Sequence, residues 1–167
     1  VKVYHLNQGQ PDIKSPACAL DAVKNFSAAN VSYSHSAGLM ELRKGMVEKY
    51  YKKIGIDITV DELIVTIAGS ESVNLALEIT CNPGDEVIVF APFFPEYRVF
   101  IEGAGATMKL IPADIEAFQI DFAAFEAAIS EKTKAVIVNS PNNPSGTIYS
   151  EDTVKKLASI LKEASSK

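Results

Sequence analysis

Cysteine and histidine are scarce in this chain, with two of each among 167 residues, and tryptophan is absent. Cys18 and Cys81 are too few and too far apart for the disulfide framework of a small secreted domain. We expect both to be buried, reduced thiols, because free cysteine is among the most buried residue types. Neither histidine has acidic or cysteine partners at ligand spacing, so the sequence predicts no metal site.

Long apolar runs and clusters of basic residues are also missing. No stretch approaches the roughly 18 apolar residues that a transmembrane helix needs, and the first residues do not resemble a secretory leader. The net charge of -5 argues against nucleic acid or an anionic membrane as a partner. We therefore expect a soluble, cytoplasmic globular protein that contacts neither nucleic acid nor membrane.

What the chain does contain is an alternation of apolar runs and amphipathic segments. Buried apolar runs predict strands at residues 63–67, 86–90, 107–111 and 135–138. Helical periodicity predicts helices at residues 16–28, 39–54, 71–80, 95–103, 122–129 and 151–164. Strands and helices that alternate at this spacing indicate an α/β fold, with three α/β/α layers around a mostly parallel sheet.

The helix expected at residues 39–54 has a clear amphipathic pattern. Its apolar side chains recur at helical spacing, which predicts a buried face made of Leu39, Leu42, Met46, Tyr50 and Ile54. The charged residues between them, Arg43 included, are expected to face water.

The most informative stretch is the loop after the strand at residues 135–138. Residues 138–146 read Val-Asn-Ser-Pro-Asn-Asn-Pro-Ser-Gly, and two prolines and a glycine exclude both helix and strand. Such a tight loop would hold the amide of Asn143 at the carboxyl end of a strand, where open α/β sheets bind ligands. An ordinary turn of Asn, Pro and Gly explains the same residues equally well.

A second candidate is the turn Ala68-Gly69-Ser70-Glu71, which joins a strand to a helix. The free N–H groups and partial positive charge of a helix N-terminus suit a phosphate. Gly69 allows close approach of the backbone, and the hydroxyl of Ser70 can donate a hydrogen bond. A plain serine N-cap at Ser70 is the alternative.

Three more residues are candidate site residues because of where they lie in the sequence. Phe94, in Pro92-Phe93-Phe94-Pro95, follows a strand and could stack on a planar heteroaromatic ring, with core packing as the alternative. Gly9 lies in the segment Gly9-Gln10-Pro11-Asp12 and by itself predicts only a turn. Tyr33 precedes the helix at residues 39–54 and by itself predicts only a surface or packed tyrosine.

Together these segments resemble one family, the class I/II aminotransferases. Asn143-Pro144-Ser145-Gly146 is similar to the Asn-Pro-(Ser/Thr)-Gly signature of these fold type I enzymes, which use pyridoxal 5'-phosphate. Four further regions agree in order and spacing, namely residues 9–12, 33–43, 68–71, and 82–87 with 92–97. The resemblance covers nearly the whole chain and is strongest to aspartate aminotransferase-like members.

The resemblance implies a cofactor role for several candidates. The turn at Ala68, Gly69 and Ser70 would hold the cofactor phosphate, although the family usually has glycine where this chain has Ala68. Phe94 would stack on the pyridine ring. Asn143 would donate its amide to the phenolic oxygen of that ring.

The resemblance also implies substrate and subunit contacts. The backbone of Gly9 would lie beside the carboxylate of the substrate. Tyr33 would reach the cofactor phosphate of the neighbouring subunit, which implies a homodimer with a shared active site. The reaction would transfer an amino group between an α-amino acid and a 2-oxo acid.

Family members are more than twice this length, so the resemblance implies an incomplete large domain. Their Schiff-base lysine, the aspartate that pairs with the pyridine nitrogen and the arginine that clamps the substrate all lie downstream of the Asn-Pro-(Ser/Thr)-Gly loop. We therefore expect no catalytic residue in this chain, which alone would be inactive. Residues 1–38 would be a lead-in with a helix and cofactor and substrate loops, and residues 39–167 the first part of the cofactor-binding large domain. The alternative is a non-catalytic short homologue that binds a small anion or a protein partner.

Overall fold

The computed structural model describes residue 3, residue 9, residues 11–114 and residues 116–166. Its helices are α1 (Ala17–Lys24), α2 (Met40–Met46), α3 (Ala68–Thr80), α4 (Glu96–Gly103), α5 (Phe122–Ala128) and α6 (Glu151–Ala164). Between α2 and α3 lie a π-helical turn, η1 (Val47–Tyr51), and two 3-10 helices, η2 (Lys52–Ile54) and η3 (Val60–Glu62). The strands are β1 (Glu86–Phe90), β2 (Thr107–Ile111) and β3 (Thr133–Ile137).

The three strands form a parallel sheet in the order β2-β1-β3. Glu86 is in register with Thr107 of β2, and Val89 is in register with Ile137 of β3. β1 is thus the central strand, and its carboxyl end lies beside the carboxyl end of β3. Loops that follow these two strands therefore emerge next to each other.

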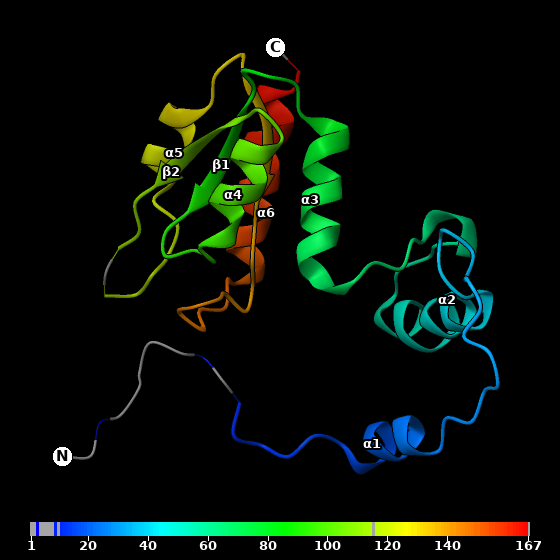
Figure 1. The fold of residues 1–167 in the computed structure, drawn as a ribbon. Helices are drawn as coiled ribbons and strands as arrows, with labels where there is room; N and C mark the ends of the chain where they lie inside the picture. Colours follow the sequence, from blue (N-terminus) through cyan, green and yellow to red (C-terminus); the bar gives the residue numbers. More distant parts are fainter. Residues whose placement is uncertain (1–2, 4–8, 10, 115, 167) are drawn as a thin grey trace.

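Helices cover both faces of this sheet (Figure 1). Successive side chains of a strand point to opposite faces, so β1 contributes to two separate cores. The core beneath α3 and α4 contains Leu77, Cys81, Val87, Val89, Ile101 and Ala106. The core beneath α5 and α6 contains Ile88, Phe90, Ile111, Ile120, Phe125, Tyr149 and Leu157. The predicted three-layer α/β/α architecture with a parallel sheet is confirmed.

Local sequence signals account for where several elements begin. Asp121 accepts a hydrogen bond from the N–H of Ala124 over 3.0 Å, and Ser150 accepts one from Thr153 over 3.1 Å. These N-caps satisfy backbone donors that the first turns of α5 and α6 leave free. Residues 86–90 and 107–111 are strands and residues 151–164 are a helix, as predicted.

The strand predicted at residues 63–67 is wrong. These residues pair with no strand in the part of the chain that the structure describes. Leu63 is buried, whereas Ile64 and Ile67 are exposed. The N–H of Val65 donates to the carbonyl oxygen of Ala37 over 3.0 Å, so a loop contact holds this segment. An apolar, β-branched run becomes a strand only where a neighbouring strand supplies its hydrogen bonds.

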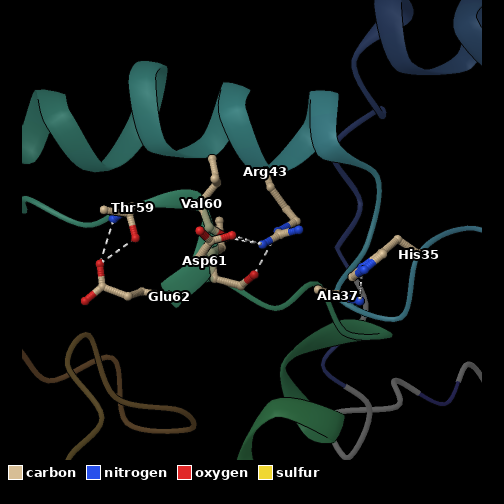
Figure 2. Close-up of polar contacts among 8 residues, drawn as sticks. His35, Ala37, Arg43, Thr59, Val60, Asp61 and Glu62 are labelled. Carbon is tan, nitrogen blue, oxygen red and sulfur yellow. Dashed lines mark hydrogen bonds and ion pairs between the residues drawn. The ribbon is translucent and has the colours of Figure 1, made fainter.

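The burial predicted for residues 39–54 is also wrong. The segment divides into α2, η1 and η2, and most of its predicted apolar face is exposed: Leu39, Leu42, Tyr50 and Ile54. Arg43, expected in solvent, is only 4% exposed. Its side chain extends from α2 toward η3, where the guanidinium donates to the carbonyl oxygen of Val60 and lies 3.7 Å from Asp61 (Figure 2). Buried backbone carbonyls provide the partners that a buried cation requires.

The lead-in helix differs from its prediction as well. α1 ends at Lys24 and contains no buried residue. Cys18 is exposed, so its predicted burial is wrong, whereas Cys81 is buried as predicted. Packing against another element decides whether an amphipathic helix buries its apolar face. Among the described residues, no helix has both the length and the apolar character needed to cross a membrane.

Candidate functional site

Two loops meet at the carboxyl edge of the sheet. The first, residues 91–95, follows β1 and carries Phe94, and the second, residues 138–147, follows β3 and carries Asn143. Because β1 and β3 are neighbouring parallel strands, both loops lie at the same edge. This is the edge at which open α/β sheets bind ligands.

Asn142 joins the two loops. Its side-chain Nδ2 donates to the carbonyl oxygen of Pro92 over 2.9 Å and to Oγ of Ser145 over 2.8 Å. Its own backbone accepts from Gly146 N–H at 2.7 Å and donates to Thr147 at 2.8 Å, which closes the second loop on itself. Sequence reasoning singled out Asn143 and missed Asn142. The adjacent pair of asparagines was the available signal, since one amide can hold the loop while the other stays free.

Asn143 has the opposite environment to Asn142. It is exposed, and its side-chain amide forms no hydrogen bond with any described residue. Asn143 is not the residue that holds the turn together, because that role belongs to Asn142. The ordinary-turn explanation of Asn143 therefore loses its main support, and its amide is free to donate to a ligand.

Phe94 is half-buried beside the ring of Tyr97. The two ring centroids are 5.5 Å apart, and the ring planes meet at 75°, an edge-to-face arrangement. Phe93, and not Phe94, packs against the core beneath α3 and α4. Core packing therefore does not explain Phe94. Burial raises the pKa of the Tyr97 hydroxyl above its ordinary value of 10.0.

The N-terminus of α3 lies at the same end of the sheet as these loops (Figure 1). A short turn joins α3 to β1, so the helix runs against the strand direction and begins near the carboxyl edge. Val73 of α3 and Phe93 of the first loop pack against the same core. The predicted phosphate turn is thus brought to the edge that carries Phe94 and Asn143.

The backbone at this turn is open to an anion. No side chain caps the first turn of α3, so its N–H groups retain their donor capacity. Ser70 lies within the helix and not at its cap, so the plain N-cap explanation of Ser70 is wrong. A Cβ placed on Gly69 would meet nothing within 4 Å, which leaves room for a group near the backbone. The carboxylate of Glu71 is turned back to accept from the N–H of Ile67.

Ala68 has a conformation that L-residues avoid. Its φ is 63°, in the left-handed region, at the first residue of α3. Glycine adopts this region without steric cost. The turn therefore has the geometry of a glycine turn even though it contains alanine.

Comparisons with known proteins show the family of the chain. Residues 1–166 match the family described as aminotransferase class I and II. The chain belongs to this aminotransferase family. A probable aspartate/prephenate aminotransferase from Thermus aquaticus is 35% identical over 162 residues, covering 96% of this chain and 42% of that protein. The chain therefore spans about two fifths of the length of the curated relatives it matches.

Solved aminotransferase structures show the same fold. An amino transferase from Eubacterium rectale superimposes with a TM-score of 0.88 at 39% identity, over 95% of this chain and 42% of that one. An aspartate aminotransferase from Thermotoga maritima gives a TM-score of 0.87 at 32% identity, over 94% and 42%. The fold is thus the first part of an aminotransferase large domain, as the sequence predicted.

Two of the predicted site residues, Tyr33 and Gly9, do not lie with the others. The side chain of Tyr33 is fully exposed, in the loop between α1 and α2. Gly9 is exposed in the lead-in, where a Cβ would meet nothing within 4 Å. The chain therefore assembles Ala68, Gly69, Ser70, Phe94 and Asn143 at one sheet edge, without Tyr33 or Gly9. In the described residues, no group of three His, Cys, Asp or Glu side chains is arranged to hold a metal.

Proposed function

We propose that this chain forms the cofactor-binding part of an enzyme that transfers an amino group between an α-amino acid and a 2-oxo acid. The cofactor is pyridoxal 5'-phosphate. One observation carries the proposal: Phe94, Asn143 and the uncapped start of α3 share the carboxyl edge of the sheet in a chain of the aminotransferase family.

The start of α3 suits the phosphate of this cofactor. The free N–H groups of the first turn and the positive end of the helix dipole attract a dianion. Gly69 leaves open space for it, and the hydroxyl of Ser70 adds a donor. Ala68 holds the left-handed conformation that points the chain into the helix.

The two loops suit the ring of the cofactor. Bound pyridoxal 5'-phosphate supplies an aromatic system that withdraws electrons from the bonds to the amino-acid Cα. Phe94 offers an aromatic face for stacking, with no polar group to compete for the substrate. The free amide of Asn143 donates to the phenolic oxygen and so fixes the orientation of the ring.

The lead-in would supply the remaining contacts. Gly9 would approach the carboxylate of the substrate with its backbone. The exposed side chain of Tyr33 would reach the phosphate in a neighbouring subunit, which makes the functional protein a homodimer with shared sites. Residues 1–38 are then a lead-in distinct from the large-domain portion at residues 39–167, and the cytoplasm is the expected location.

Aspartate is the first amino acid to test. The relatives of this chain include a probable aspartate/prephenate aminotransferase from Thermus aquaticus and an aspartate aminotransferase from Thermotoga maritima. The complete gene product, supplied with pyridoxal 5'-phosphate, is expected to convert aspartate and 2-oxoglutarate to oxaloacetate and glutamate. A full-length protein that transfers the amino group of no α-amino acid, and that binds the cofactor elsewhere, would refute the proposal and favour a non-catalytic homologue.

A binding experiment tests the site in this chain directly. The probe is 4'-deoxypyridoxine 5'-phosphate, which keeps the phosphate and phenolic oxygen but has no aldehyde to react with lysine. Phe94→Ala and Asn143→Ala are each expected to weaken its binding about tenfold, the effect of a lost stacking or hydrogen-bond contact. Unchanged affinity in both variants would remove these residues from the site.

A further inference from the structure

Asn142 is the only residue in the described chain whose side chain hydrogen-bonds across the gap between residues 91–95 and residues 138–147. The bond to the Pro92 carbonyl spans 50 positions of sequence. A carbonyl oxygen only accepts, so the NH₂ group of the amide must face Pro92. An aspartate of the same shape could not make this bond.

The same NH₂ group also donates to Ser145 Oγ, whose hydroxyl donates onward to Thr147 Oγ1 at 2.9 Å. These bonds are partly buried, so water competes with them less than at the surface. Each of the two amide hydrogens thus has its own acceptor, one in each loop.

The position of Phe94 depends on this tie. Pro92 lies two residues before Phe94, and the carbonyl of Phe94 accepts from Tyr97 N–H over 3.0 Å at the start of α4. The first loop is therefore fixed at both ends, by Asn142 on one side and by α4 on the other. The ring of Tyr97 holds the ring of Phe94 from its edge.

The position of Asn143 also depends on Asn142. Asn143 directly follows Asn142 and has no side-chain bond of its own to the described chain. Its direction is therefore set by the backbone of Asn142, which bonds to Gly146 and Thr147.

From this arrangement we infer that Asn142 is a positioning residue, which holds Phe94 and Asn143 in fixed relation so that both meet one planar ring. The inference deepens the proposed function and rests on it for the identity of the ring. Both amide hydrogens of Asn142 are used within the protein, so it would donate to neither the ring nor the phosphate. It acts through Pro92 on one loop and through its own backbone on the other.

Amide hydrogen exchange in the ligand-free chain is the first test. In Asn142→Asp, exchange of Tyr97 N–H should quicken about fivefold, because the first loop loses one neutral hydrogen bond. The matched control is Ser145→Ala, which loses three hydrogen bonds within the second loop but keeps the bond to Pro92. It should quicken Gly146 N–H and leave Tyr97 N–H unchanged. Equal effects of both variants on Tyr97, or none in Asn142→Asp, would overturn the inference.

Ligand affinity is the second test. Asn142→Asp should lower the affinity for 4'-deoxypyridoxine 5'-phosphate about five- to tenfold. The affinity for inorganic phosphate, which needs only the start of α3, should change by less than about twofold. A general loss of structure would weaken both probes and lower the melting temperature, which would contradict a positioning role. If the unchanged chain binds neither probe, the proposed cofactor site fails, whereas the exchange experiment still decides whether Asn142 couples the loops.

Discussion

The Nε of Arg43 donates to the carbonyl oxygen of Leu63 over 3.0 Å, across 20 residues of sequence. The same guanidinium donates to the carbonyl oxygen of Val60, so one buried side chain of α2 holds both ends of η3, in the segment that enters α3. Thr59 and Glu62 close η3 with a capping box (Figure 2). The buried guanidinium of Arg43 thus holds the segment that leads into the candidate phosphate turn.

Replacing Arg43 should loosen this segment. Arg43→Met keeps the apolar stem but leaves two carbonyl oxygens without their charged donor, which costs about 2 to 3 kcal/mol in the free energy of local opening. Amide exchange of Val65 and Glu62 would measure it. Arg98→Met is the matched control, because Arg98 forms only an exposed pair with Glu102 at 3.6 Å and should cost less than about 0.5 kcal/mol. Equal effects in the two variants would contradict the assigned role of Arg43.

Gly38 should not tolerate a side chain. Its φ is 96°, and a Cβ there would lie 2.6 Å from Cβ of Val65 and 2.7 Å from its Cγ2. Gly38→Ala adds a steric clash to the backbone cost and should destabilise by more than about 2 kcal/mol in urea unfolding. Gly55 also has a positive φ, 76°, but a Cβ would meet nothing within 4 Å. Gly55→Ala should therefore cost only about 1 kcal/mol; an equal cost at both sites would show that the contact with Val65 does not matter.

The same substitution should have opposite signs at two positions of α3. Ala68→Gly relieves a left-handed alanine and is expected to raise the free energy of unfolding by about 0.5 to 1 kcal/mol. Ala76→Gly, in the exposed interior of the helix, should lower it by about 1 kcal/mol. Thermal and urea unfolding would report both. Destabilisation by Ala68→Gly would mean that the positive φ of Ala68 is not present in solution.

Glu86 should make stability depend on pH in the acid range. A hydrogen bond from Ser130, with further help from Lys109 at 3.3 Å, holds the pKa of Glu86 below its ordinary value of 4.5. A folded pKa that lies below the unfolded one gives stability that is present above about pH 4.5 and is lost as pH falls through the folded value. The free energy of unfolding of wild type should exceed that of Glu86→Gln at pH 7, and the two should converge as the pH falls through the folded pKa of Glu86.

Glu102→Gln serves as the control for that pH series, since Glu102 pairs only with exposed Arg98. Its difference from wild type should stay small at every pH. A gap between wild type and Glu86→Gln that persists unchanged at pH 3 would show that the charge of Glu86 contributes nothing.

The sequence predicted well wherever a local pattern was enough. Residues 86–90 and 107–111 are short, largely apolar runs between turns, and they are strands in the structure because each finds a neighbour. Residues 63–67 show the same pattern without such a neighbour in the described chain. The local pattern indicates that a segment can form a strand, but whether a neighbouring strand pairs with it depends on the whole fold.

The sequence singled out candidate residues that are open to a ligand. It missed the residues whose side chains hydrogen-bond to distant parts of the chain. Asn143 and Gly69 stood out because their motif is typical of a ligand site. Asn142 and Arg43 act on Pro92 and Leu63, which are 50 and 20 residues away, so no local pattern could identify their partners. A charged residue in an amphipathic helix predicts solvent exposure until distant carbonyls supply its hydrogen bonds.

The central position of β1 also determines when the protein can fold during synthesis. Both partners of β1 come later in the chain, β2 from Thr107 and β3 from Thr133. At roughly 5–20 residues per second on the ribosome, Val87 to Phe90 wait several seconds for β3 after they emerge. Parallel pairing between such distant segments is slow to form. The most buried strand of this sheet therefore spends several seconds on the nascent chain without one of its two partners.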